Sequence, residues 1–475
     1  KSKKKRAASP IASESSGEEY DPLKSEKTER TSRISAAEKK DVGPQSPWAL
    51  NMPEEILTKI FEYVITSQGT LPTVIRLGRV CRFWHSVSCR PELWKNVDLA
   101  AYTAEKCKTD YKLVWLLENR LSHCQSLNIV CNVSWVLACV AEYCQNLMEL
   151  SLAGWCRITP EQLFELLQGL PKLQRLDLSL TSETGGSSTC LSAASMARLA
   201  ENFGERLTHL TLANNKFTAL PQILSSAHCV NLEVLDISGA LATSHPAAIP
   251  LEALQKGCPK LRVFRAANSQ LVLASATTSQ QVLMEAGGWT QLEELSIAGE
   301  AAAERVGVGE YRLGDEALSR LVRAATRLRL LDLRGLQRLT DSGLVRVPAW
   351  DLQHLFLGGC NVTRQSSACL ELICEKWSHS LIELDLSWAS ASRVLDDAVS
   401  ALADSPNMLN LCGSSVSLEP IKKVLLKCPL VESINLSSCR ALPRGMKRLY
   451  TGKELHNTSY EVLFCSNKTR STIGS

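Results

Sequence analysis

The chain has 475 residues, of which 45% are hydrophobic, 21% are charged and only 5% are aromatic. Its formal net charge of +4 is weak for this length and gives no reason to expect a nucleic-acid or membrane partner. No apolar run approaches the roughly 18–20 residues of a membrane span. The 18 cysteines include no Cys-x-x-Cys pair, which argues against zinc ribbons and thioredoxin-like redox sites. We therefore expect buried free thiols in a reducing, intracellular compartment.

Residues 1–46 are rich in Lys, Ser, Glu and Pro and poor in large apolar side chains. This composition predicts a disordered tail. The tail begins with a basic cluster, Lys1–Arg6, which could direct nuclear import or could be a solvated charge run. The expected location is therefore the cytoplasm, the nucleus or both. Because the first residue is lysine rather than methionine, the natural N-terminus and its targeting signals could lie upstream.

Residues 47–99 show apolar side chains at helical spacing. A first helix is predicted at Pro53, since proline suits the first turn and the acids that follow suit the positive end of the helix dipole. A loop is expected over 66–72, and a second amphipathic stripe runs from Val74 to Trp84. A third short element begins at Pro91.

From about residue 120 the chain repeats the pattern Leu-x-x-Leu-x-Leu-x-x-(Cys/Asn), the leucine-rich-repeat signature. Clear matches lie at 147–152, 173–178, 207–215, 232–237, 292–297, 328–333, 352–360, 381–386 and 431–439. Less regular matches lie at 124–129, 261–264 and 409–411. The pattern predicts roughly eleven or twelve repeats, about 28 residues apart.

One such repeat cannot bury its leucines alone, so neighbouring repeats must stack. The predicted fold is α/β, with a three-helix domain over 47–99 and a leucine-rich-repeat solenoid over 100–450. The solenoid should have a curved parallel β-sheet inside and helices outside, one of which should be capped by Thr159 ahead of Pro160 and Gln162. Insertions are expected at 185–188 and 266–289, and a cap or tail over 451–475.

Residues 47–97 resemble an F-box, through the segments 52–57, 60–61, 80–84 and 93–94. The repeats resemble the cysteine-containing leucine-rich class, with Cys258 and Cys428 each preceding a proline before a strand. Together the two likenesses span about 85% of the chain and indicate the F-box/leucine-rich-repeat family. The resemblance implies a substrate receptor of an SCF-type ubiquitin ligase. In that family the F-box binds a small adaptor, which links to a cullin scaffold, and the repeats hold a protein substrate.

The residues that the resemblance assigns to the adaptor interface fall into two groups. Those expected to face the adaptor are Pro53, Ile56, Leu57, Ile60 and Phe61. Those expected either to join them or to pack the domain itself are Leu77, Val80, Trp84 and Trp94. The alternative is that all of them form a small helical core. Contact is favoured because three short helices cannot bury so much apolar surface among themselves.

The strand residues between the inward leucines should face outward and are candidates for substrate contact. These candidates are Arg175, Asp177, Asp236, Asp332, Arg334, Phe356, Asp385 and Trp388. The four aspartates occupy equivalent positions and would form an acidic stripe. The competing interpretation is that short polar residues at these positions serve only solubility and hydrogen bonds at the strand edge.

The sequence offers no catalytic signature. It contains no phosphate-binding Gly-Lys-Ser/Thr loop, no His-Glu-x-x-His and no Gly-x-Ser-x-Gly. We therefore expect no cofactor, no metal site and no catalytic residue. Two alternatives to the ligase receptor remain, which are a non-catalytic repeat scaffold or inhibitor acting outside a ligase, and a chromatin-associated protein acting through the basic tail.

Overall fold

The computed structural model describes residues 52–452 except 101–109, 131–134, 156–157, 181–191, 218–228, 243–246, 270, 274–286, 300–312, 366–369, 403–405, 429 and 445. The chain divides into two units, Lys1–Met52 and Pro53–Ser475. The predicted tail at 1–46, the expected insertion at 185–188 and residues 453–475 lie outside the described residues. None of the described helices is both long and apolar enough to cross a membrane.

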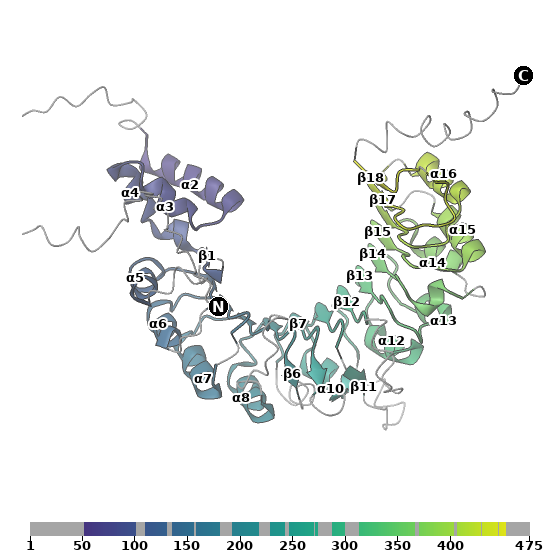
Figure 1. Cartoon of the computed structure of the whole chain (residues 1–475). Helices are drawn as coiled ribbons and strands as arrows, with labels where there is room; N and C mark the ends of the chain where they lie inside the picture. Colours follow the sequence, from purple (N-terminus) through teal and green to yellow (C-terminus); the bar gives the residue numbers. More distant parts are fainter. Residues whose placement is uncertain are drawn as a thin grey trace, which may run out of the picture. The chain divides into compact units, whose positions relative to one another are not determined.

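The second unit begins with a group of helices, three of which (α2, α3 and α4) are labelled in Figure 1. They are α2 (Glu54–Gln68), α3 (Thr73–Gly78), α4 (Arg82–Ser88) and the 3-10 helix η2 (Pro91–Trp94). Helix α2 packs against the other three. It continues past Thr66, where a loop was expected, and ends at Gln68, because the next residue, Gly69, has a φ of +84° that is not helical. The second stripe, expected from Val74 to Trp84, is divided between α3 and α4, and the expected third element is η2.

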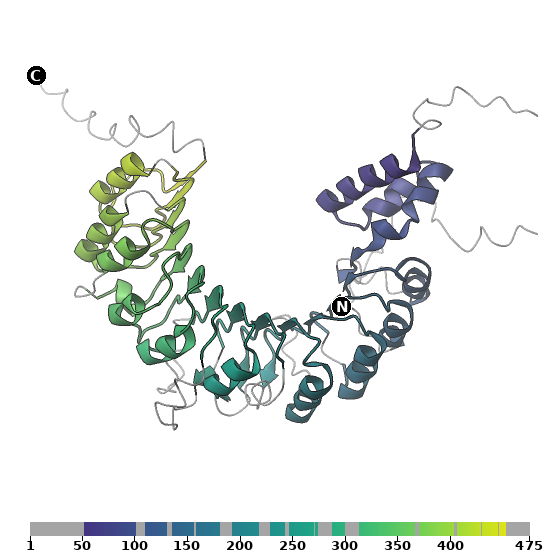
Figure 2. The same cartoon turned by 180° about the vertical axis from the view of Figure 1, so that it is seen from behind.

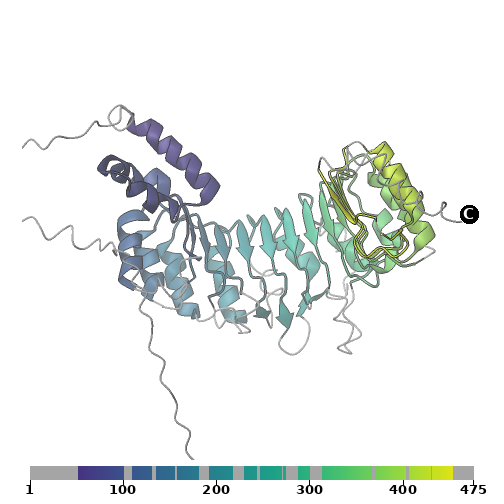
Figure 3. The ribbon, with the colours of Figure 1, turned by 45° about the horizontal axis from the view of Figure 1, so that its top comes forward.

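Within the described residues a main sheet of 14 strands follows, with each strand paired to its neighbour in register. Figure 3 shows these strands side by side. The strands are β1 (Asn96–Asp98), β2 (Ser126–Asn128), β3 (Glu149–Ser151), β4 (Arg175–Asp177), β5 (His209–Thr211), β7 (Val234–Asp236), β10 (Val263–Arg265), β12 (Glu294–Ser296), β13 (Leu330–Asp332), β14 (His354–Phe356), β15 (Glu383–Asp385), β16 (Met408–Asn410), β17 (Ser433–Asn435) and β18 (Leu449–Thr451).

Two features of this sheet differ from the sequence prediction. The pairing is parallel from β1 to β17, but β18 returns antiparallel against β17. The sheet also begins at Asn96, inside the range assigned to the helical domain. Only Lys95 separates η2 from β1, so the repeats start directly where the helices end.

The helices of the repeats lie along one face of the sheet, as Figures 1 and 2 show from opposite sides. They are α5 (Asp110–Arg120), α6 (Trp135–Tyr143), α7 (Pro160–Gly169), α8 (Ala193–Phe203), α10 (Leu251–Gly257), α12 (Asp315–Val322), α13 (Asp341–Val345), α14 (Leu370–Trp377), α15 (Ser392–Ala401), α16 (Leu418–Lys427) and the 3-10 helix η8 (Asn361–Thr363). The central residue of each strand of the main sheet is buried, as at Leu150 and Leu355. The predicted cap of α7 is confirmed, since Thr159 and Gln162 form a complete capping box.

Two further pairs of short parallel strands lie outside the main sheet. They are β6 (Lys216–Phe217) with β8 (Leu241–Ala242), and β9 (Ala247–Ile249) with β11 (Leu271–Leu273). Strand β11 falls within the insertion that was expected at 266–289. Helix α10 reaches α12 through an ion pair between Glu252 and Arg320, 2.8 Å long.

The polar position of the repeat is occupied by side chains that donate to buried carbonyl groups. Asn215 donates to the Leu178 carbonyl at 2.9 Å. The thiol of Cys360 donates to the Leu333 carbonyl at the same distance, and Cys439 follows the same pattern. The cysteines of the described ranges are free thiols, and most of them are buried.

Candidate interaction surfaces

The helical domain has a small core of its own. Leu57 and Phe61 lie on one face of α2 and are fully buried. The Phe61 ring meets Trp84 edge to face, with centroids 5.1 Å apart. Trp94 is also buried, and its indole N–H donates to the Ser88 carbonyl at 2.8 Å.

This core corrects part of the predicted adaptor interface. Leu57 and Phe61 were expected to present their side chains to a partner, and that prediction was wrong for the chain as folded here, because α3, α4 and η2 cover them. For Trp94 the core alternative holds. Trp84 and Leu77 are half-buried and do not decide between the two interpretations.

A second face of α2 stays uncovered. Ile56, Ile60 and Tyr63 are spaced four and three residues apart, so their side chains form one line along the helix. They are 48%, 41% and 80% exposed. We call these three residues the α2 stripe. Pro53 at the start of α2 is exposed too, as is Val80 between α3 and α4. Of these residues, only Tyr63 was missed by the sequence analysis, although its helical spacing from Ile56 and Ile60 could have revealed it.

Polar contacts fix α2 against the rest of its domain and against the first strand. The Arg90 guanidinium lies 3.0 Å from the Glu54 carboxylate at the start of α2. After the end of α2, the Thr70 hydroxyl donates to the Asn96 carbonyl of β1. These contacts hold the stripe in a defined position with respect to the first repeat.

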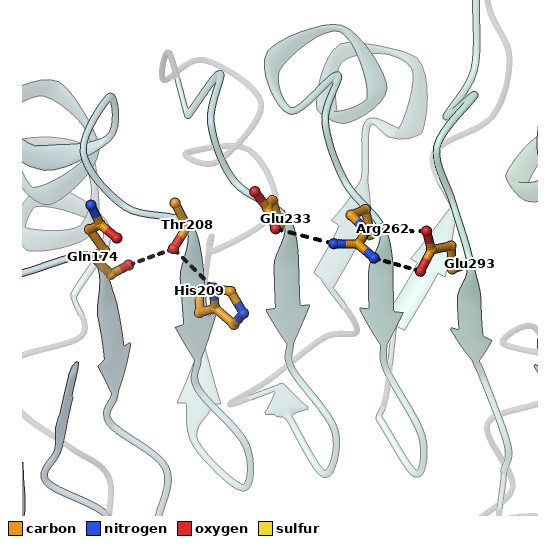
Figure 4. A network of polar contacts seen from close by, with 6 residues as sticks. All are labelled: Gln174, Thr208, His209, Glu233, Arg262 and Glu293. Carbon is orange, nitrogen blue, oxygen red and sulfur yellow. Dashed lines mark hydrogen bonds and ion pairs between the residues drawn. The ribbon is translucent and has the colours of Figure 1, made fainter. Parts of the chain in front are cut away.

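The open face of the sheet, opposite the helices, carries a ladder of polar contacts where the strands begin. Figure 4 shows Arg262 between Glu233, at 3.6 Å, and Glu293, at 2.9 Å. Next to this trio, Thr208 donates to the Gln174 carbonyl and contacts the ring of His209. Partial burial, and then the charge of Arg175, lower the pKa of His209, so its ring stays neutral at pH 7.

The predicted acidic stripe at the strand ends is not an open surface. Asp332 and Asp385 are only 6% exposed. Asp385 accepts the N–H of Ser387 at 2.8 Å, two residues further along the chain. Asp177 and Asp236 accept the equivalent N–H groups of the turns that follow them. These carboxylates therefore serve the turns, as the competing interpretation proposed. Burial contradicts the expected outward exposure at Asp332 and Asp385, whereas Asp177 and Asp236 stay half-exposed and their role in substrate contact stays a prediction.

The other predicted substrate contacts are accessible. Arg175 is exposed and lies 3.8 Å from Glu149. Arg334 binds Asp332 at 2.8 Å and stacks over Phe356, with the guanidinium carbon 5.2 Å from the ring centre. Trp388 is among the exposed large apolar side chains. Within the described ranges, no group of three or more His, Cys, Asp or Glu side chains has a geometry suited to a metal ion.

A family model described as F-box-like matches residues 49–100. Residues 49–100 are an F-box-like domain. The α2 stripe is thus an exposed apolar surface of an F-box-like domain, and the parallel sheet with helices that follows resembles a leucine-rich-repeat solenoid. Among solved structures, the chain is similar to the Rad7 and Elc1 complex of yeast, with 17% identity over 88% of this chain and 100% of that one, and a TM-score of 0.43. It is also similar to a leucine-rich-repeat protein of Leptospira interrogans, with 19% identity over 74% of this chain and 80% of that one, and a TM-score of 0.44.

Proposed function

We propose that the chain is the substrate-recognition subunit of an SCF-type ubiquitin ligase. The F-box-like domain binds the adaptor subunit, the adaptor links it to the cullin scaffold, and the repeats hold a protein substrate for ubiquitination. In this proposal the chain itself carries no catalytic residue and works inside the cell, in the cytoplasm, the nucleus or both. The stretches 251–259 and 439–445 are similar to the family member named F-box/LRR-repeat protein 6, and we extend the proposal to a close relationship with it.

The α2 stripe is the observation that carries the proposal. Full burial of a large apolar side chain that was in water contributes roughly 1.5–3 kcal/mol. Ile56 and Ile60, which are about half exposed, would contribute part of that when a partner covers them. Three such side chains on one helix, with Pro53 and Val80 exposed in the same domain, can anchor an interface in the manner of a helix laid into a groove.

The second half of the proposal requires that substrate and adaptor be held by one connected body. Strand β1 follows η2 after a single residue, and Thr70 of the F-box-like domain bonds to Asn96 of that strand. A substrate on the sheet is therefore presented by repeats that begin directly at the adaptor-binding domain.

One observation favours the alternative of a scaffold or inhibitor acting outside a ligase. Leu57, Phe61 and Trp94 are buried within the domain itself. The apolar surface left for a partner to cover is therefore smaller than the sequence indicated. The two functions differ in whether the α2 stripe is used, and the experiment is designed on that difference.

The full chain is co-expressed with the SCF adaptor and cullin, captured, and probed for both partners. Wild type should retain adaptor and cullin together, and an Ile56→Asp/Ile60→Asp variant should lose both. Ile382→Asp, an exposed isoleucine that follows α14 ahead of β15, is the matched control and should retain them. Failure of wild type to retain the adaptor would favour the scaffold, as would equal retention by the stripe variant.

A further inference from the structure

Most strands of the sheet leave through a turn that contains one left-handed residue, three positions after the strand ends. This conformation favours glycine, and also asparagine or serine, because a β-carbon crowds the backbone there. The described residues that adopt it are Gly154, Asn214, Gly239, Asn268, Gly335, Gly359, Trp388, Gly413 and Ser438.

Trp388 stands out in this row. Its φ is +59°, a backbone conformation that a bulky side chain adopts only under strain. Burial of the side chain contributes little stability, since 58% of the residue is exposed. The indole rests on the next turn, at Gly413, where an added β-carbon would lie 2.5 Å from ring atom Cε3. A tryptophan at a position that favours glycine strains the backbone, and this exposed side chain buries little surface to offset the strain. Its presence is therefore hard to explain by folding stability.

The turn next to the one that holds Trp388 carries the guanidinium group of Arg364. Arg364 lies against the neighbouring turn, with Nη2 3.9 Å from where a β-carbon of Gly359 would be. That turn is bonded to the one holding Trp388, through the Gly359 N–H and the Ser387 carbonyl at 2.9 Å. Among the described residues, Arg364 bonds through its side chain to the amide of Gln337 and forms no ion pair.

The carboxylates in this region are withdrawn from solvent. Asp332 is engaged by Arg334 and by the Ser296 hydroxyl, and Asp385 is engaged by the Ser387 N–H. Arg334 itself keeps about half of its side chain exposed, at 51%. The guanidinium of Arg334 is already paired with Asp332, whereas that of Arg364 has no ion pair among the described residues. Arg364 is therefore the charged group at these strand ends that remains for a carboxylate of a partner, beside the exposed indole of Trp388.

We propose that Trp388 anchors a docking surface at the carboxyl ends of β14 to β16. Its occupant is an extended segment of a partner protein in which a large apolar side chain stands next to Asp or Glu carboxylates. The apolar side chain stacks on the indole, the indole N–H donates to a carbonyl of the segment, and Arg364 binds a carboxylate. This inference rests on the proposed function, for which such a segment would mark a substrate.

The test uses the full chain purified with its adaptor and fluorescein-labelled nine-residue peptides. One peptide has Phe flanked by glutamates, a second has lysines in place of the glutamates, and a third has Ser in place of Phe. Fluorescence anisotropy should show the glutamate–Phe peptide binding best. Trp388→Gly should weaken it by about tenfold or more, and Arg364→Gln should weaken it while leaving the lysine peptide unchanged. Trp350→Gly, which removes an exposed tryptophan between α13 and β14, should leave the affinity intact.

The thermal midpoint separates docking from folding. Trp388→Gly should unfold at the same temperature as wild type or higher, because it relieves the strained turn. A lower midpoint would overturn the proposal, as would equal binding of all three peptides, unchanged binding by Trp388→Gly, or binding only after phosphoserine replaces glutamate.

Retention of the adaptor is measured in the same samples. If the chain binds the peptide but does not retain the adaptor, the ligase role is contradicted and the docking surface is supported. If the chain retains the adaptor but binds no peptide, the docking surface is contradicted and the ligase role is unaffected.

Discussion

The buried thiols of the repeats behave as small apolar side chains with one hydrogen to donate. Burial raises the pKa of Cys124, Cys144, Cys360 and Cys374 from an ordinary 9.0 to about 12. The thiolate is the reactive form, and in these sites it is both disfavoured and inaccessible. Iodoacetamide at pH 8 should therefore modify exposed Cys81 in the native chain and spare these four. Peptide mass spectrometry reads this out, and labelling of Cys360 as fast as Cys81 would contradict it.

The same thiols make stability depend on alkaline pH. A raised pKa in the folded state means that the folded chain holds its protons after the unfolded chain has released them. Their contribution is complete below pH 9 and is lost as pH rises from 9 towards 12. For each thiol, the free energy of unfolding should fall by about 1.4 kcal/mol per pH unit in that window. Chemical denaturation at pH 8, 9.5 and 10.5 tests this, and Cys360→Ala should flatten the decline.

Phe61 distinguishes a core residue from a contact residue. It is fully buried and meets Trp84, so Phe61→Ala should destabilise the F-box-like domain by about 3–5 kcal/mol. Tyr63→Ala, two residues away and 80% exposed, should cost less than about 0.5 kcal/mol. Hydrogen exchange of the α2 amides measures both. Equal protection in the two variants would mean that the core described here does not form.

At the scale of single elements, capping controls where the helices begin. In α7 the Thr159 hydroxyl accepts the backbone N–H of Gln162 at 3.3 Å, and the Gln162 side-chain oxygen accepts the backbone N–H of Thr159 at 3.1 Å. Thr159→Ala should destabilise α7 by about 1 kcal/mol and speed hydrogen exchange in its first turn. Thr66→Ala, in an exposed part of α2, is the control and should leave α7 unchanged. Unaltered exchange in α7 after Thr159→Ala would contradict a stabilising role for the cap.

Element boundaries that depend on local chemistry were predictable, and those that depend on tertiary contacts were not. The spacing of the leucines predicted the strands, and Thr159, Pro160 and Gln162 predicted the start of α7. Strand β1 was missed because a three-residue strand carries almost no periodicity of its own, and it forms by pairing with β2. The antiparallel return of β18 likewise depends on its partner β17.

The candidate sites were harder to predict than the elements, for a physical reason. Helical spacing shows which residues share a face, but not which face the neighbouring helices cover. Leu57, Ile60 and Phe61 were therefore all assigned to the surface, and of the three only Ile60 is exposed. Alternation along a strand predicted that Asp385 points outward. It could not predict the following turn, in which the Ser387 N–H donates to the Asp385 carboxylate. The strained backbone at Trp388 could be predicted only by aligning the repeats, which places Trp388 at the position that glycine occupies in other turns.

For the whole molecule, the central claim is that an adaptor covers the α2 stripe. Site-specific photo-crosslinking tests it most directly, with p-benzoylphenylalanine replacing Tyr63 in the full chain and, as a control, replacing exposed Trp350 between α13 and β14. After irradiation with the adaptor present, the probe at position 63 should give a covalent chain–adaptor product and the probe at position 350 should give none. The same yield from both positions, or no product from position 63 while adaptor stays bound, would contradict the account.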